Sequence, residues 1–439
     1  MRSWHNESMK IFKTIELSGA VLFLVLAGLC FFYPRQSAEF LLRAMLLLAL
    51  LSALALWWEA FRKRTGMAFL EAFGGTVIAM LLNYRVQTGY ELLYILFAIY
   101  MLAYSGVFWM QFWLDRKDHS PMAKQDGWTA AGFMAFSIVL FALRKHNLDW
   151  LQYFLGVYFL LQALQIFAEK LLFRSVPSSR YYNFKNWISL PVFFIAVFPS
   201  WILRWMLHEK MKGHEIDFDQ RKNDEEVNFN VWIHSGLKGV HQFGHMTLSW
   251  QGEMFSYGNY DNAEKFFFTL VGPGVFFTAP EKIYVNNSCV IEGSTIFQYG
   301  LHLSPEQIHA FEAYINNILN ETYPWYSPIQ EEIRQTGTAD FEKYESDYAC
   351  RLWYRTGCAF RKFYTGQWKY YWNMGTNCSL FAADILHKIQ PDIKKSRGII
   401  SPGEFFLYFE EAFQDPSSNV ITKAWHTPDY PETLFDVPD

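Results

Sequence analysis

The sequence predicts two domains of different class, an N-terminal all-α helical membrane bundle followed by a soluble α+β domain. Long apolar segments fill residues 1–205, whereas short β-type runs and amphipathic helices follow residue 230. Charge divides in the same way, because residues 1–205 carry 19 Lys and Arg against 11 Asp and Glu, and the remainder carries 19 against 31. We therefore expect a membrane domain over 1–205, a linker over 206–230 and a soluble domain over 231–439. The acidic soluble half argues against nucleic acid as a partner, since phosphate binding needs clustered Lys and Arg.

About seven apolar segments predict the membrane helices. Most approach the roughly 20 residues needed to cross a hydrocarbon core, although the third and fifth are short. The first has no small-residue cleavage site and a second apolar segment follows at once, so we expect it to be retained. The segments are residues 11–33, 39–61, 66–83, 91–113, 127–143, 149–172 and 185–205.

Basic residues predict the orientation of these helices. They gather in the loops on the side of the N-terminus, as in Arg62-Lys63-Arg64, whereas the opposite loops hold few, such as Arg35 and Arg85. The positive-inside rule then places the N-terminus in the cytoplasm, and seven crossings export the C-terminal domain. The membrane lipid bilayer is thus the first expected partner. Carboxylates in or near the predicted spans are expected to lie close to the interfaces, namely Glu16, Glu59 and Glu71.

The spans also pair into hairpins of similar length, over about 11–61, 66–113 and 127–172. The first is a Gly- and Leu-rich segment, then Pro34, then an apolar return segment. This pattern resembles the HdeD-type family of small bacterial membrane proteins, which are built from repeated two-helix units. The resemblance implies a multi-pass protein of the bacterial inner membrane, with its C-terminal domain in the periplasm.

Strand and turn signals predict the α+β domain. The runs 231–233, 245–250 and 253–257 are of β type, and Gln251-Gly252 between the last two predicts a two-residue hairpin. Ser304-Pro305-Glu306-Gln307 is a capping box that opens a helix. We expect further strands at 266–271, 282–286 and 295–301, and helices at 331–363 and from Asn377 onward.

The segment Gly375–Leu386 carries the strongest chemical signal. It places Cys378 in the first turn of a helix, after Asn377 and before an apolar face. A helix N-terminus stabilises a thiolate and so lowers the pKa of the thiol. The free backbone N–H groups of that turn, including that of Cys378, could also hold an oxyanion. Cys378 is therefore the candidate nucleophile, unless it is only a small buried apolar residue.

A nucleophilic thiolate needs an imidazole, and His245 at the start of a predicted strand offers one. Its orienting partner is left open among Tyr257, Asn259 and Asp261. His234 and His241 are rival imidazoles. No His-x3-His, Cys-x2-Cys or His-Glu-x-x-His spacing occurs, so neither a zinc site nor another cofactor is predicted.

The order of these motifs resembles circularly permuted papain-like domains, the superfamily of NlpC/P60-type peptidases and lecithin:retinol acyltransferase-like proteins. A strand that starts Gly-His comes first, then a strand that ends Phe-Ser-Tyr-Gly (255–258), a capped helix, Asn-Cys at 377–378, and Ser401-Pro402-Gly403. The family's nucleophile corresponds to Cys378 and its base to His245, whereas the third catalytic position does not correspond clearly to any residue.

The resemblance implies a membrane-anchored cysteine hydrolase that cleaves an amide bond at the outer face of the inner membrane, with peptidoglycan stem peptides as the favoured substrate. One alternative is acyl transfer or hydrolysis on a lipid or lipoprotein. Another is a non-catalytic, stress-related membrane protein with a binding domain.

Two further patterns leave alternatives open. Cys350 and Cys358 lie about 12 Å apart along a continuous helix, so a disulfide between them requires a break at Gly357. The aromatic residues of the soluble half serve either as core or as a substrate groove, and they are Trp325, Tyr326, Trp353, Tyr354, Trp368, Tyr370, Tyr371 and Trp372.

Overall fold

The computed structural model describes residues 18–64, 66–86, 91–118, 120, 123–143, 149–167, 219–235, 245–267, 269–390 and 402–426. The chain forms two compact units. The first comprises Met1–Phe112 and Lys124–Arg174, and the second comprises Trp113–Ala123 and Ser175–Asp439. The predicted seventh span, 185–205, lies outside the described residues, as do His241 and Gly244.

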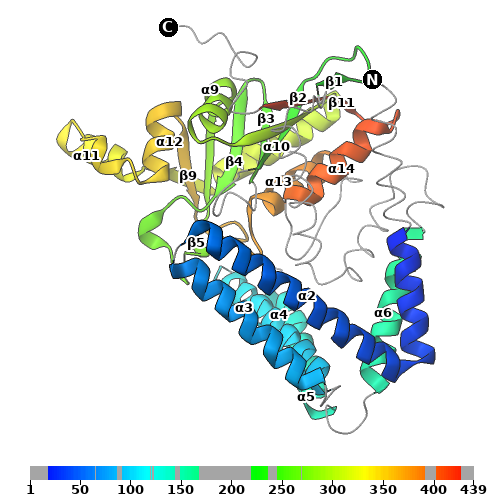
Figure 1. Ribbon diagram of the computed structural model, residues 1–439. Helices are drawn as coiled ribbons and strands as arrows, with labels where there is room; N and C mark the ends of the chain where they lie inside the picture. The colour runs from blue at the N-terminus through cyan, green and yellow to red at the C-terminus, as the bar shows by residue number, and fades with distance from the viewer. Residues whose placement is uncertain are drawn as a thin grey trace. The chain divides into compact units, whose positions relative to one another are not determined.

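The first unit is helical (Figure 1). Pro34 in the first turn begins α2, and Arg64 in a left-handed conformation follows its last turn. Among the described residues, two helices are long and apolar enough to cross a membrane, Tyr94–Lys117 and Ala123–Leu143. They coincide with two of the seven predicted spans. The helices are Ser18–Phe32, α2 (Pro34–Lys63), α3 (Gly66–Val86), α4 (Glu91–Lys117), α5 (Ala123–Leu143) and α6 (Asp149–Phe167).

Small residues make the helix contacts of this unit. Ala60 and Ala72 are fully buried where α2 and α3 run side by side (Figure 1). A Cβ added to Gly75 would lie 2.9 Å from the side chain of Leu56, so the two helices approach closely there. Large apolar side chains instead point outward, and Leu48 and Leu54 are 64% and 66% exposed. Close packing through small residues is the pattern of helices that associate in lipid.

The second unit is an α+β domain built on an antiparallel sheet of nine strands, in the order β1-β11-β7-β2-β3-β4-β6-β9-β8. A separate antiparallel pair joins β5 (Val271–Pro273) to β10 (Tyr370–Trp372). The nine strands are β1 (Gln220–Arg221), β2 (Phe229–Ser235), β3 (His245–Trp250), β4 (Glu253–Gly258), β6 (Val275–Pro280), β7 (Thr295–Leu301), β8 (Thr322–Trp325), β9 (Ala359–Phe363) and β11 (Val420–His426). β1 falls inside the stretch predicted as a linker.

The hairpin of β3 and β4 confirms the predicted turn. Gln251 and Gly252 both have positive φ, of 52° and 78°. A type I′ turn requires positive φ at both central positions, and its twist matches that of the flanking strands. The turn fixes the register in which Leu248 pairs with Phe255, so the side chains on each face of the hairpin are determined by their position in the sequence.

Helices cover both faces of the sheet, and alternate residues along its strands supply two cores. α10 (Pro305–Asn320), α13 (Cys378–Ile389) and α14 (Pro402–Gln414) contribute to the larger core, with residues such as Val231 and Tyr257. Trp232 and Phe277 point to the opposite face, where α9 (Glu281–Asn286) and α12 (Tyr348–Thr356) pack. The capping box predicted for α10 is confirmed, since Ser304 and Gln307 bond reciprocally.

Three local predictions were wrong. Where a strand was expected at 266–271, Phe266 makes a single bridge with Val271, the first residue of β5, and the described residues between them form turns. Residues 282–286, expected as a strand, lie in α9, which begins directly after Pro280. The helix expected over 331–363 is divided. It comprises the end of α11 (Pro328–Thr336), a short 3-10 turn, α12 and strand β9, because Gly337 and Gly357 adopt left-handed conformations that end the two helices.

Candidate functional site

Cys378 is the first residue of α13, as predicted. Asn377 precedes the helix in an extended conformation, and its side-chain oxygen accepts a hydrogen bond from the backbone N–H of Leu380 at 3.0 Å. Phe381 and Ile385 anchor the helix in the larger core, so the start of the helix is held rigidly against the sheet. The thiol is buried, with Cys378 only 4% exposed.

His245 is the first residue of β3 and pairs with His234 across β2. Its imidazole lies close enough to the Cys378 thiol to lower the pKa of that thiol. Its Nε2 atom lies 2.8 Å from the Ser256 hydroxyl on β4, and the Tyr260 hydroxyl lies 3.5 Å from the same nitrogen. The structure therefore brings together the two residues that the sequence selected as nucleophile and base. It also places polar groups on the ring nitrogen Nε2.

The electrostatics of Cys378 differ from those of an ordinary buried thiol. Burial raises its pKa, but the imidazole of His245, the backbone N–H of Met246 and the hydroxyl of Tyr371 stabilise the thiolate more strongly. The resulting pKa is about 7, below the usual value of 9.0. Tyr371 donates to the sulfur at 3.8 Å, and burial raises its own pKa well above the usual range, so the donor stays protonated. A substantial share of Cys378 is therefore thiolate at neutral pH.

The other three cysteines of this unit form a control. Cys289, Cys350 and Cys358 each have a pKa raised to about 12, and burial is the first cause in each case. None of the five cysteines is in a disulfide. Gly357 does end the helix between Cys350 and Cys358, but both thiols remain free. Burial alone therefore gives an inert thiol here, and Cys378 differs because of its polar neighbours.

The three residues considered as orienting partners of His245 make their described contacts elsewhere. The Tyr257 hydroxyl donates to the carbonyl oxygens of Trp368 and Tyr370, at 2.9 and 3.2 Å. The Asn259 amide donates to the Thr269 carbonyl oxygen. Asp261 caps a short turn and forms a buried ion pair with Lys362.

Ser256 and Tyr260 are the residues that sequence reasoning missed. Ser256 is buried, and it bonds both the His245 ring and the Tyr260 hydroxyl. The signal for Ser256 was present, because the register of the hairpin places it diagonally opposite His245 on the same face. Tyr260 lies beyond the end of β4, where no periodicity could predict its direction.

His234, a rival base, lies beside His245 with ring centroids 5.7 Å apart. Its Nε2 atom lies 3.2 Å from the Thr247 hydroxyl, and its ring is also 5.7 Å from that of Tyr284. Burial lowers the pKa of His234 well below its usual value, and the neighbouring His245 lowers it further. His234 is therefore neutral, and its ring packs beside that of His245.

The aromatic residues before Cys378 divide between core and site. Trp368 and Trp372 are buried, and Tyr257 stacks on Phe381 with centroids 4.7 Å apart. Tyr371 alone of this stretch contacts the thiol in the described structure. The rings thus form the apolar wall of the site.

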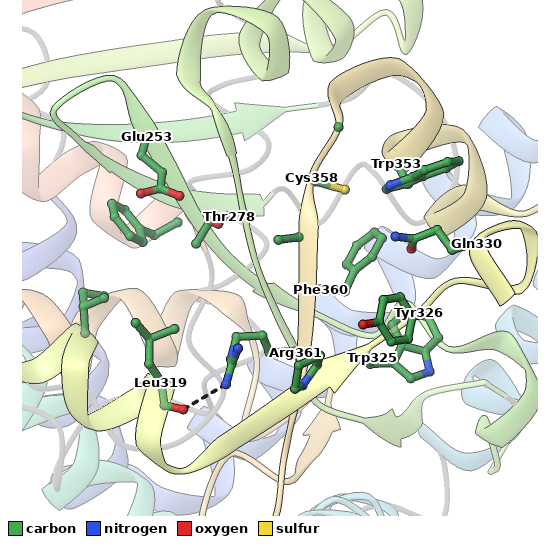
Figure 2. Close-up of a pocket in the computed structure, with 15 residues that line it drawn as sticks. Glu253, Thr278, Leu319, Trp325, Tyr326, Gln330, Trp353, Cys358, Phe360 and Arg361 are labelled. Atoms are coloured by element: carbon green, nitrogen blue, oxygen red, sulfur yellow. Dashed lines mark hydrogen bonds between the residues drawn. The ribbon is translucent and has the colours of Figure 1, made fainter. Parts of the chain in front are cut away.

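Other aromatic residues line a separate groove of about 590 Å³. Figure 2 shows Trp325, Tyr326 and Trp353 on one side of this groove and Glu253 on the other. Glu253 directly follows the hairpin turn, at the end of the β3–β4 hairpin away from His245. Cys358 lines the groove, but no histidine does so among the described residues. The candidate pair of Cys378 and His245 therefore lies apart from this groove, at the other end of the hairpin.

The described residues contain no group of three or more His, Cys, Asp or Glu side chains that could hold a metal ion. Comparisons with protein-family models, curated proteins and solved structures found no significant match. The permuted papain-like and HdeD-like resemblances thus remain predictions.

Proposed function

We propose that this protein is a membrane-anchored thiol hydrolase that cleaves an amide bond through a covalent thioester on Cys378. One observation carries the proposal: the buried Cys378 thiol has a pKa lowered to about 7 beside the imidazole of His245, whereas burial raises the pKa of the three other cysteines of the same unit. A low thiol pKa beside an imidazole is the property that a thiol nucleophile needs.

The arrangement supports each step of the reaction. His245 takes the proton of the Cys378 thiol, the thiolate attacks the amide carbonyl carbon, and the C–S bond forms as the carbonyl π electrons move to oxygen. The N–H groups of the first turn of α13, including that of Cys378, can turn to this oxyanion, and the Tyr371 hydroxyl is a further donor near the sulfur. The C–N bond then breaks, and His245 gives its proton to the leaving amine.

Hydrolysis of the thioester completes the cycle. His245 takes a proton from water, the hydroxide attacks the same carbonyl carbon, and the sulfur leaves as thiolate. Ser256 and Tyr260 keep the ring oriented throughout, since both reach its Nε2 atom and leave the other nitrogen for the sulfur and the substrate.

The membrane part of the proposal is a multi-pass anchor in a bacterial inner membrane, with the thiol domain on the periplasmic side. The buried alanines and exposed leucines of the first unit support a lipid surrounding, and the distribution of Lys and Arg supports the orientation. A periplasmic amide next to the membrane makes peptidoglycan stem peptides the first substrate to test.

A second function, acyl transfer or hydrolysis on a lipid or lipoprotein, is favoured by the apolar wall of the site. Tyr371 contacts the buried thiol, the neighbouring Tyr257 stacks on Phe381, and such an apolar surface suits an acyl chain. The third possibility is a domain that binds without catalysis. Binding alone would not require the lowered pKa of Cys378.

The test is hydrolysis by the purified full chain in detergent, with muropeptides and with acylated lipopeptides as substrates. We expect one class to be cleaved, the Cys378→Ala variant to lose the activity, and Cys358→Ala to keep it. Activity that survives in Cys378→Ala would overturn the proposal, and cleavage of the lipopeptide alone would select the second function.

A further inference from the structure

Two adjacent turns next to the thiol site expose large apolar side chains. Phe267 is 47% exposed and Met374 is 40% exposed. Phe267 and Thr269 have positive φ, of 49° and 66°, which is unfavourable for side chains of these types. We call the described residues of this pair of turns, 266–267, 269–270 and 373–375, the apolar tip. An exposed aromatic side chain on a strained backbone is a feature that folding alone does not require.

The apolar tip is joined directly to the nucleophile. Strand β5 pairs with β10, so that Val271 lies opposite Trp372, and the backbone N–H of Asn373 donates to the Leu270 carbonyl oxygen at 3.2 Å. The Phe267 ring lies against that of Trp372, with centroids 6.0 Å apart. Met374 lies in a tight turn, in which the Gly375 N–H donates to the Trp372 carbonyl oxygen. This turn precedes Cys378 by only a few residues. Whatever the tip binds is therefore held close to the reacting sulfur.

The same compact unit includes Trp113 and Lys117, which contact the tip and its neighbouring strand. The Trp113 ring is 51% exposed and lies 6.4 Å from the Phe266 ring. Lys117 donates to the Tyr370 hydroxyl at 2.8 Å. Lys117 is also the last residue of Tyr94–Lys117, one of the two described helices that are long and apolar enough to cross a membrane. Trp and Lys at the end of such a helix are typical of the membrane–water interface.

We infer that the apolar tip docks into the headgroup region of the lipid bilayer, and that Cys378 acts on a substrate anchored in that bilayer. This inference rests on the proposed function and names its substrate class. Phe267, Met374 and Trp113 supply the apolar surface, and Lys117, which contacts Tyr370, adds a positive charge suited to anionic headgroups. The tip thus brings a lipid-linked carbonyl to the entrance of an otherwise buried thiol.

A first experiment measures insertion of the tip. The full chain carrying Cys378→Ala is reconstituted into phosphatidylglycerol–phosphatidylethanolamine vesicles, and a bimane label is attached at Phe267→Cys. Ile283→Cys on α9 is the matched control, because Ile283 is also 47% exposed. We expect brominated acyl chains to quench the label at 267 at least about twofold and to leave the label at 283 unchanged, since quenching requires depth in the acyl boundary. Equal, weak quenching at both positions would overturn the inference, as would protection of the label at 267 by a bound protein instead of lipid.

A second experiment separates this inference from the proposed function. Cys378 is alkylated either by 2-bromopalmitate in the vesicles or by water-soluble iodoacetamide, and in both reactions the thiolate displaces halide to form a C–S bond. Phe267→Asp should slow the first reaction about tenfold, because it removes apolar contact with the bilayer, and leave the second unchanged. Ile283→Asp should leave both unchanged.

The outcomes of the two alkylations are distinct. Equal loss of both reactions in Phe267→Asp, or no change in either, contradicts docking of the tip. If iodoacetamide fails to label Cys378 in the unaltered chain at neutral pH, the proposed function itself fails.

Discussion

The two units of this chain bury opposite kinds of side chain. The helical unit buries Ala60 and Ala72 completely and leaves Leu48 and Leu54 mostly exposed. The sheet unit buries its largest side chains, such as Trp232 and Phe297, and covers them with helices. Water drives large apolar side chains inward, whereas lipid is as apolar as leucine and favours contacts between small residues. The difference indicates that the described parts of the two units are suited to different surroundings, and the second unit holds the proposed site of Cys378 and His245.

Truncating one apolar side chain to alanine in each unit should give the largest difference between the two units. Phe297→Ala in the sheet unit should reduce the free energy of unfolding by about 3–5 kcal/mol, because it leaves a cavity in a packed core. Leu48→Ala in α2 should change it by less than about 0.5 kcal/mol, as expected for an exposed site. Thermal unfolding of the full chain in detergent, followed by near-ultraviolet circular dichroism, measures both. A large effect of Leu48→Ala would show that this side chain packs inside a protein core.

The reverse substitution tests the packing of small residues. Ala72→Leu should destabilise the helical unit by about 1–3 kcal/mol, since α2 and α3 leave no room for a larger side chain there. Ala55→Leu, on the exposed side of α2, is the matched control and should be neutral. Protease resistance of the helical unit in detergent measures the effect. Equal resistance of the two variants would contradict the close approach of α2 and α3.

The smallest effect concerns the orienting group of the imidazole. Ser256→Ala removes one buried hydrogen bond to His245, and a loss of about 1 kcal/mol corresponds to a rate reduction of roughly fivefold to tenfold. Ser256→Thr, which retains a hydroxyl, should restore part of the rate. Ser249→Ala is the control, because the Ser249 hydroxyl on β3 accepts a hydrogen bond from Trp232 on β2. The readout is kcat/KM together with its pH profile, and an unchanged profile and rate in Ser256→Ala would deny Ser256 an orienting role.

The sequence predicted the parts of this structure that depend on local signals. The helix start at Cys378, the turn at Gln251-Gly252 and the capping box at Ser304 are each specified within four residues, and all three are confirmed. The order of His245 before Cys378, at the ends of a strand and a helix, was enough to select the pair that the fold brings together.

What the sequence did not predict depends on contacts between distant segments. Residues 282–286 have β-type side chains, but Pro280 and Glu281 begin a helix there and the apolar face packs in the smaller core. Tyr260 reaches His245 from beyond the end of a strand, and its ring is fixed by Tyr348 from α12. The ion pair of Asp261 with Lys362 joins residues 101 positions apart. The sequence therefore could not show that Asp261 pairs with Lys362 and does not orient His245.

His245 and its neighbours should convert the buried Cys378 thiol into a thiolate. The pH dependence of Cys378 alkylation tests this conversion most directly. The rate of iodoacetamide labelling at Cys378, quantified by peptide mass spectrometry, should rise with pH and reach half its plateau near pH 7, because the thiolate fraction grows as pH passes the pKa. In His245→Ala, burial should dominate and move the midpoint above the usual thiol value of 9.0. A midpoint at or above 9.0 in the unaltered chain, unmoved by His245→Ala, would contradict the account.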